Sequence, residues 1–239
     1  MIFRLIPLLF RDPGAFILVF VFFLLLIGLS LATAITVHEF SHALAASLLG
    51  DGTARRHGRL SLSPLAHLDM MGTILIFLVG FGWGKPVPVN PNALRSGPRA
   101  GMALVAVAGP LANLATAALF ALPVRLGWVA WHPPLAIAIT YSLNLSGLLS
   151  DLLSFVILYN VLLAVFNLIP LAPLDGFRVV LGLLPRQLAF SFARLERWGP
   201  ALLLTIIALD GFASLGILWR VMEPAANLVS LVLLRRPLL

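Results

Sequence analysis

The sequence predicts an all-α, polytopic integral membrane protein with about five to six hydrophobic segments, and its composition carries this prediction. Hydrophobic residues make up 61% of the 239 residues, and charged residues only 10%. Soluble globular domains carry roughly a quarter charged residues. A chain with so few charged side chains cannot cover a water-soluble surface, so its long apolar segments are expected to face lipid.

The first hydrophobic segment, residues 15–49, is unusually long. No charged residue occurs from Ala15 to Val37. A single straight helix over this segment would be about 52 Å long, which exceeds the ~30 Å hydrocarbon core of a bilayer. The segment is therefore either one long tilted helix or two pieces broken near Gly28–Ser30. A cleaved secretory signal is excluded, because the apolar region of such a signal is much shorter.

The next part of the chain alternates between polar loops and a short apolar piece. The alternating residues of Arg59–Ser63 predict a short strand. Residues 68–83 are apolar but too short to cross a bilayer comfortably, so we expect a re-entrant or interfacial piece. Residues 82–91, GWGKPVPVNP, are rich in glycine and proline, which predicts an irregular loop.

The remaining apolar runs predict further membrane spans. Residues 100–127, 146–170 and 199–220 are long enough to cross, and residues 225–234 form a shorter C-terminal segment. No internal repeat or low-complexity tract divides the chain. We therefore expect residues 1–239 to form a single membrane domain.

Basic residues gather in three loops, 50–67, 84–99 and 177–198, which together hold 10 of the 16 lysines and arginines. The 128–146 connection has none. Two spans separate the second loop from the third, so all three lie on one side, which the positive-inside rule makes cytoplasmic. The net charge of +7 is thus explained by topology and by the anionic headgroups of the lipid bilayer, and no nucleic-acid partner is expected.

The stretch TVHEFSHALAAS, residues 36–47, places an acid and two imidazoles inside the first apolar segment. His38 and His42 are four residues apart and so share one face of a helix. With Glu39 they form the H-E-x-x-H pattern, in which two histidines bind zinc and the glutamate is the general base. Ionisable groups at membrane depth are costly and indicate function. The alternative is a buried polar trio that stabilises helix packing.

A catalytic zinc needs one more protein ligand. Asp175 is favoured because it follows NLIPLAP at the cytoplasmic end of the 146–170 span, at a depth similar to that of the histidines. There, prolines disrupt the helix and free carbonyl groups. The alternative for Asp175 is an acid in a Pro-Asp-Gly turn. The other candidates are His57, His67, Asp69, His132 and Asp151. His57 and His67 are expected to be solvated loop residues, and His132 is expected on the far side of the membrane. Asp151 is better explained as an acid at a helix N-terminus.

Three ordered motifs carry a resemblance to a known family. HEFSH, GPLAN at residues 109–113 and NLIPLAPLDG at residues 167–176 resemble the core motifs of the site-2 protease family of intramembrane zinc metalloproteases. GWGKPVPVNP further resembles the compact bacterial and archaeal branch, which lacks PDZ and CBS modules. The connection at 128–146 is too short for a PDZ module, and we expect no CBS-like domain after the core.

The resemblance implies a three-helix catalytic core within about residues 30–180, followed by C-terminal membrane segments at about 199–234. It implies one zinc ion per chain, bound by His38, His42 and Asp175, with Glu39 as the catalytic glutamate. Asn167 matches the asparagine that the family places near the scissile carbonyl. The resemblance also implies a multi-pass protein of the cell (inner) membrane, with an active site that is sunk in the bilayer and faces the cytoplasm.

The expected reaction is hydrolysis of a peptide bond within or near a transmembrane segment of a membrane protein substrate. Glu39 takes a proton from the attacking water and passes it to the departing amine. Asn113 and Asn167 are candidate hydrogen-bond donors to the oxyanion or the substrate backbone, and helix packing is an equal alternative for Asn113. We expect residues 82–91 to act as a gate and Arg59–Ser63 as an edge that pairs with the substrate.

Two other function classes remain open from the sequence. A membrane metal transporter could also use histidines and an acid, but it needs no H-E-x-x-H glutamate and favours repeated halves. A catalytically inactive membrane scaffold would keep the fold. Cleavage of a membrane-span substrate, and its dependence on Glu39, separates the three classes.

Overall fold

A computed structural model describes residues 6–79, 82–134 and 145–238, and these residues form helices, turns and loops without a named strand. The prediction of an all-α membrane protein is confirmed. Among the described residues, the helices long and apolar enough to cross a membrane are α2 (Pro13–Leu48), α5 (Pro98–Arg125), α6 (Leu145–Asn167) and α10 (Ile217–Leu234).

The first hydrophobic segment forms one continuous helix. The short helix α1 (Ile6–Arg11) precedes it, and Asp12 then caps α2 by accepting a hydrogen bond from the Ala15 N–H at 2.9 Å. The helix runs for 36 residues, through Gly28 and Ser30 without a break. In lipid an interrupted helix would leave backbone groups without hydrogen bonds, so one small residue is not sufficient to end it.

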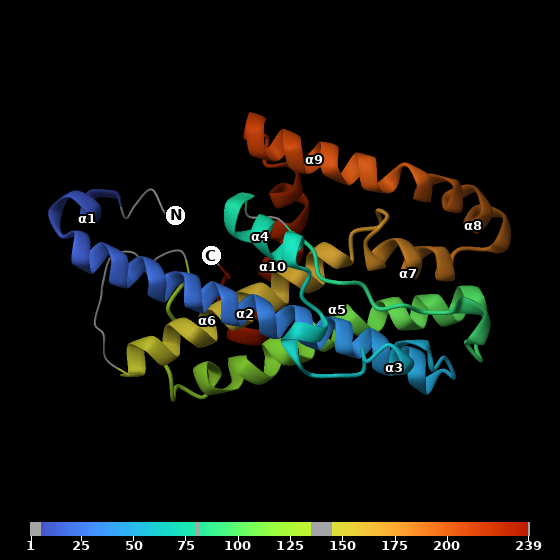
Figure 1. Cartoon of the computed structure of the whole chain (residues 1–239), viewed down its shortest axis with the longest axis horizontal. Helices are drawn as coiled ribbons and strands as arrows, with labels where there is room; N and C mark the ends of the chain where they lie inside the picture. Colours follow the sequence, from blue (N-terminus) through green and yellow to red (C-terminus); the bar gives the residue numbers. More distant parts are fainter. Residues whose placement is uncertain (1–5, 80–81, 135–144, 239) are drawn as a thin grey trace.

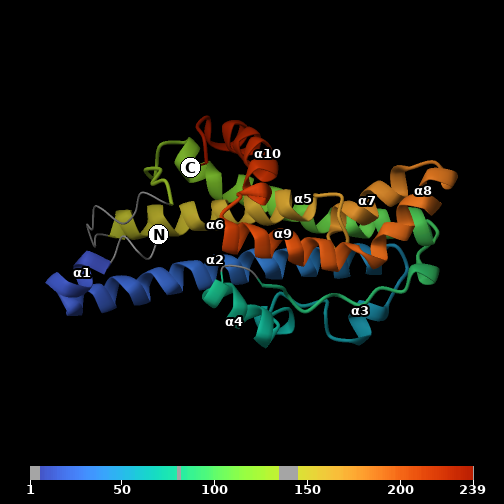
Figure 2. The ribbon, with the colours of Figure 1, turned by 90° about the horizontal axis from the view of Figure 1, so that it is seen from above.

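Three helices, α2, α5 and α6, lie side by side along the long axis of the molecule and form its core (Figures 1 and 2). Phe23 of α2 packs edge-on against Phe155 of α6, with ring centroids 5.3 Å apart. Ala117 and Ala121 of α5 pack against Ile157 and other apolar residues of α6. Alanines allow the helix backbones to approach closely, which is typical of helix contacts in membranes.

The connection between α2 and α5 is mostly irregular. It contains α3 (Thr53–Arg56), a 3-10 turn at Pro64–Ala66, α4 (Met70–Val79) and a 3-10 turn at Pro91–Ala93. The short apolar piece predicted at 68–83 is thus a helix of 10 residues. The strand predicted at Arg59–Ser63 is wrong, because none of the segments that the structure describes pairs with it. The β pairing described in this connection is one isolated antiparallel bridge, between Leu68 and Gly84.

The C-terminal part follows α6 as α7 (Asp175–Leu183), α8 (Arg186–Ala193), a 3-10 turn at Arg194–Arg197, α9 (Gly199–Ala213) and α10. The apolar run at 199–220, predicted to be one span, does not form one continuous helix. Its helix ends after 15 residues, where Ser214 and Gly216 adopt positive φ angles. The Asp210 carboxylate accepts hydrogen bonds from the N–H groups of the first two residues of α10. The last segment is therefore longer than the predicted 225–234.

The three basic loops gather at one end of the core. The α3 region, the beginning of α5 and the α7–α8 junction all lie at the right-hand end in Figure 1. The end of α5 and the beginning of α6 lie toward the opposite end. This arrangement agrees with the segregation of charge on which the predicted orientation depends.

Candidate active site

The two histidines of the H-E-x-x-H pattern and Asp175 converge on one point. His38 and His42 lie one turn apart on α2, are both buried, and have their Nε2 atoms 3.1 Å apart. The Asp175 Oδ2 atom lies 3.1 Å from the first Nε2 and 3.2 Å from the second. Asp175 begins α7, some 130 positions further along the chain, so the tertiary fold brings this predicted trio together.

This trio fits a zinc ion. Four ligands at about 2.0–2.1 Å from zinc in tetrahedral geometry lie roughly 3.3 Å from one another, close to the three distances found. The Asp175 Oδ2 atom is buried and forms no well-directed hydrogen bond, although both imidazoles are within reach. Short distances without well-directed hydrogen bonds are expected when ligand atoms point toward a common centre and not at each other. Two histidines and a carboxylate are also a known ligand set of catalytic zinc sites.

Hydrogen bonds on the far side of each imidazole fix its tautomer. His42 Nδ1 donates to the carbonyl oxygen of Val105 at 2.7 Å, and His38 Nδ1 donates to Asn113 Oδ1 at 2.7 Å. A carbonyl oxygen can only accept, so the His42 proton resides on Nδ1. Both Nε2 atoms are therefore left with a free lone pair toward Asp175. Such outer hydrogen bonds orient metal-binding histidines.

The Asn113 amide is oriented by its other partners. Its Nδ2 donates to the carbonyl oxygen of Ala34 at 2.9 Å and to Asn160 Oδ1 at 2.8 Å. Asn160 Nδ2 in turn donates to the carbonyl oxygen of Val156. Both amide hydrogens of Asn113 are thus used, and none is left for an oxyanion. The structure favours the packing alternative for this residue, and adds that it holds His38.

Gly109 lies against the same two imidazoles. A Cβ atom at Gly109 would come within 2.5 Å of the His42 ring and 2.7 Å of the His38 ring. Gly109 and Asn113 are four residues apart and so lie on the same face of α5. The GPLAN motif therefore supports the metal site in two ways. Gly109 leaves space for the two imidazole rings, and Asn113 orients the ring of His38 by a hydrogen bond.

Glu39 is half-buried and forms no hydrogen bond or ion pair with any residue that the structure describes. Its neighbour across the site is Gly84. A Cβ atom at Gly84 would lie 3.6 Å from Glu39 Oε1 and 3.0 Å from Ile35 Cγ2. The loop that begins at Gly82 therefore passes directly beside the predicted general base.

Asn167 is the last residue of α6 and is half-buried. Its Nδ2 donates to the carbonyl oxygen of Leu163 at 3.0 Å, and no hydrogen bond joins it to the metal ligands within the described ranges. The chain then turns sharply toward Asp175. Gly176 allows this turn, because a Cβ atom there would lie 2.3 Å from the Leu168 carbonyl oxygen.

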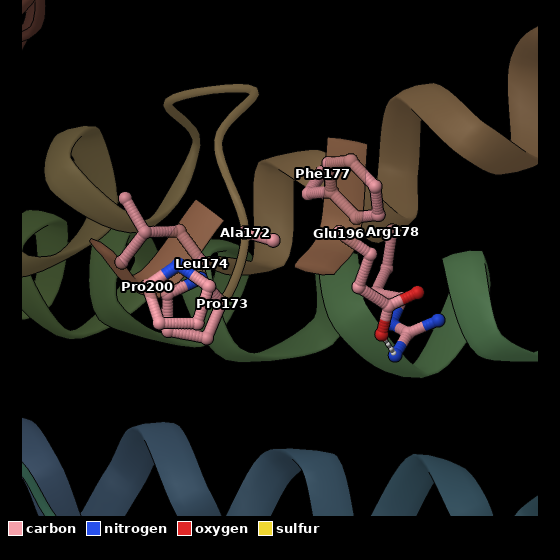
Figure 3. A pocket seen from close by; sticks show the side chains of 7 residues that line it. All are labelled: Ala172, Pro173, Leu174, Phe177, Arg178, Glu196 and Pro200. Atoms are coloured by element: carbon pink, nitrogen blue, oxygen red, sulfur yellow. Dashed lines mark hydrogen bonds and ion pairs between the residues drawn. The ribbon is translucent and has the colours of Figure 1, made fainter. Parts of the chain in front are cut away.

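A pocket of about 230 Å³ lies next to the loop that carries Asp175, but Asp175 does not line it (Figure 3). Arg178 of α7 forms an ion pair there with Glu196. This pair ties α7 to the 3-10 turn before α9. The pocket is lined by Ala172, Pro173, Leu174, Phe177, Arg178, Glu196 and Pro200.

The other ligand candidates lie away from the described metal group. His57 is exposed, and Asp69 caps α4 by accepting from the Gly72 N–H. His132 pairs with Asp151 at 2.9 Å. The interpretation of His67 as a solvated loop residue is wrong, because its side chain is completely buried.

Comparison with known proteins now decides the family. The model of peptidase family M50 matches residues 22–209. This chain belongs to the M50, or site-2 protease, family. The family is embedded in membranes and consists of zinc metalloproteases.

Two relatives agree with this assignment. "Putative zinc metalloprotease YwhC" of Bacillus subtilis (strain 168) is 37% identical over 171 residues, which cover 72% of this chain and 74% of the relative. "Putative zinc metalloprotease Rip2" of Mycolicibacterium smegmatis is 27% identical over 172 residues, which cover 70% of this chain and 60% of the relative. No solved structure matches this site-2 protease family member.

Proposed function

We propose that this M50 chain is an intramembrane zinc endopeptidase that hydrolyses a peptide bond within or near a transmembrane segment of a membrane protein. One observation carries the proposal: His38, His42 and Asp175 converge on one point, next to the unpaired carboxylate of Glu39. This set lies in the core formed by three apolar helices. Such a site can receive a transmembrane segment as its substrate while that segment stays in the bilayer.

The protein side chains divide the work of hydrolysis. His38, His42 and Asp175 would hold the zinc ion, which when bound polarises a carbonyl group and provides a nucleophile at neutral pH. Glu39 accepts the proton from the attacking water on a carboxylate oxygen and returns it to the amide nitrogen that leaves. Its lack of any described hydrogen-bond partner leaves both oxygens free for this transfer.

Asn167 is proposed to bind the substrate backbone near the scissile carbonyl. One of its amide hydrogens is used by Leu163, and the other is available for a substrate oxygen. Its place at the end of α6, just before the turn to Asp175, supports this role. Asn113 takes no part in substrate binding in this proposal.

The proposed location is the cell (inner) membrane, with the site open to the cytoplasm. The clustering of the basic loops at one end of the core supports this orientation (Figure 1). The partners are then the lipid bilayer and a transmembrane substrate. The distribution of arginines gives no reason to add a nucleic acid.

The test is cleavage of a model transmembrane substrate by the purified protein and by Glu39→Gln. The substitution keeps the size of the side chain and removes its basicity, so cleavage is expected to fall by roughly 10²–10⁴-fold. Zinc content should remain that of the wild type, because Glu39 is not a ligand. Glu223→Gln, in an exposed position of α10, is the matched control and should cleave normally. Normal cleavage by Glu39→Gln would refute the mechanism.

A further inference from the structure

The loop beside Glu39 can form few backbone hydrogen bonds to the rest of the protein, although Val89 near its end packs against the apolar cluster that contains Ala46. Residues 84–91 read GKPVPVNP. Proline lacks an N–H group, so the alternating Pro86 and Pro88 prevent a regular ladder of hydrogen bonds. The prolines also stiffen the segment. A stiff loop of this kind keeps its position only if its ends are fastened.

One end is fastened to His67. The Lys85 N–H donates to the His67 carbonyl oxygen at 2.7 Å, next to the isolated bridge between Leu68 and Gly84. The His67 side chain is completely buried and donates from Nε2 to the Ser61 carbonyl oxygen at 2.6 Å. His67 therefore joins the segment that contains Ser61 to the beginning of the loop at Lys85.

The other end is fastened to Asp51, which follows α2. The Asp51 side chain is completely buried. One carboxylate oxygen accepts from the N–H and the hydroxyl of Thr53, at 2.9 and 2.5 Å. The second oxygen accepts from the Asn90 N–H at 2.6 Å. The second bond joins the end of α2 to the loop, across 39 positions of sequence.

A buried carboxylate without a direct ion pair is costly unless hydrogen bonds replace its hydration. The structure describes no ion pair for Asp51. Burial alone would raise the pKa of Asp51, but the hydrogen bonds from Thr53 and Asn90 and the charge of Arg56 outweigh it and lower the pKa below its ordinary value. The ionised form is thus the one that these donors are arranged to bind.

We propose that Asp51 is a positioning residue for the protease, which holds the loop from Gly84 to Asn90 as a fixed wall of the substrate path beside Glu39. The inference rests on the proposed function and deepens it. With both ends tied, Gly84 stays within reach of Glu39 and the path keeps its width. The loop predicted to be a gate is, in this proposal, held firmly at its two ends.

The chain contains no cysteine, so a single introduced thiol can report on the loop. A nitroxide spin label on Val87→Cys, midway between the two anchors, measures loop mobility by electron paramagnetic resonance. Asp51→Asn keeps the size of the side chain but cannot accept from both Thr53 and Asn90. The label is expected to become more mobile in this variant than in the labelled parent.

A matched control separates the bond from Asp51 to the loop from the hydrogen bonds between Asp51 and Thr53. Thr53→Val removes the hydroxyl that donates to the same carboxylate, but leaves the bond from Asn90 in place. Its label should move as in the parent. Equal mobility in Asp51→Asn and the parent, or equal gains in Asp51→Asn and Thr53→Val, would overturn the proposal.

A second pair of variants tests the same bond from the loop side, in case Asp51→Asn does not fold. Asn90→Pro deletes the N–H that donates to Asp51, whereas Asn90→Ala keeps it. Both lose the side-chain hydrogen bond to the Asn92 N–H. Only Asn90→Pro is expected to raise label mobility. Equal mobility in the two variants would contradict the proposal.

Kinetics connect the anchor to substrate binding. Losing a hydrogen bond to a charged group should raise KM about tenfold in Asp51→Asn, with kcat within about twofold. Zinc content should be unchanged. A fall in kcat with unchanged KM would refute the positioning role. If the wild type cleaves no membrane-span substrate, the proposed protease function fails, while the mobility measurements still decide whether Asp51 holds the loop.

Discussion

At the scale of single residues, the metal site depends on side chains that do not touch the metal position. Asn113 accepts from His38 Nδ1, and Asn160 accepts from Asn113 in turn. A chain of three polar side chains therefore extends from the site into the contact between α5 and α6. Asn113, at its centre, uses its amide oxygen and both amide hydrogens, which keeps such a network stable in apolar surroundings.

Asn113→Leu tests this chain. The substitution leaves the His38 Nδ1–H without its acceptor, so the imidazole loses the bond that sets its tautomer and direction. Zinc affinity is expected to fall by about 10- to 100-fold. Competition with a chromophoric chelator measures the affinity in detergent. Thr116→Val is the control, because its hydroxyl donates within α5 to the Ala112 carbonyl oxygen. Unchanged zinc affinity in Asn113→Leu would show that His38 is oriented by other contacts.

At the scale of elements, helix contacts decide what local sequence patterns could not. The first apolar segment continues through Gly28 as one helix, and Phe23 and Leu26, on the turns before Gly28, pack against Phe155 of α6. The segment predicted at 199–220 breaks at Ser214, where Asp210 begins the next helix by binding its N–H groups. Hydropathy alone misplaced this boundary, since both helices are apolar.

Gly109→Ala tests the close contact between α5 and α2. The added methyl group would lie 2.5 Å from the His42 ring, so the imidazoles or the helices must move apart. Zinc binding and cleavage should both fall by at least about tenfold, because ligand positions must be held within about 0.5 Å. Gly211→Ala in α9 is the matched control, since a Cβ atom there meets nothing within 4 Å. Equal zinc affinity in the two variants would contradict this account of the GPLAN motif.

At the scale of the whole molecule, the charge distribution predicts how the protein sits in the membrane. The α7–α8 junction and the C-terminal end of α5 lie at opposite ends of the core (Figure 1). The segment 177–198, which contains this junction, holds four arginines, whereas the sequence that follows α5, residues 128–146, has none. The positive-inside rule assigns the arginine-rich end to the cytoplasm.

Single cysteines test this orientation. Arg186→Cys and Trp128→Cys introduce thiols at exposed positions of the two ends. In intact cells, a membrane-impermeant maleimide is expected to label only Trp128→Cys. Arg186→Cys should react after the membrane is disrupted. The reverse pattern would place the proposed active site on the outer face and exclude a cytoplasmic route for water.

The amino-acid sequence was sufficient to predict the membrane class, because composition and the length of apolar runs are local quantities. It also determined the shared face of His38 and His42, since their spacing follows from helix geometry. Asp175 could be favoured by its depth and its motif, but its approach to the histidines is a property of the packed core. The ordered motifs predicted the family, and the match to the family model over residues 22–209 confirmed it.

The tertiary structure alone decided the supporting parts of the site. Asn160 is a polar residue in an apolar run, a signal that sequence reasoning used for the histidines but not for this helix. Asp51 and His67 lie in a polar loop, where polar residues carry no such signal. Their burial and partners arise from contacts across tens of positions. Hydrophobic periodicity describes which face of one segment is buried, whereas the partner of a buried polar atom depends on which segments meet.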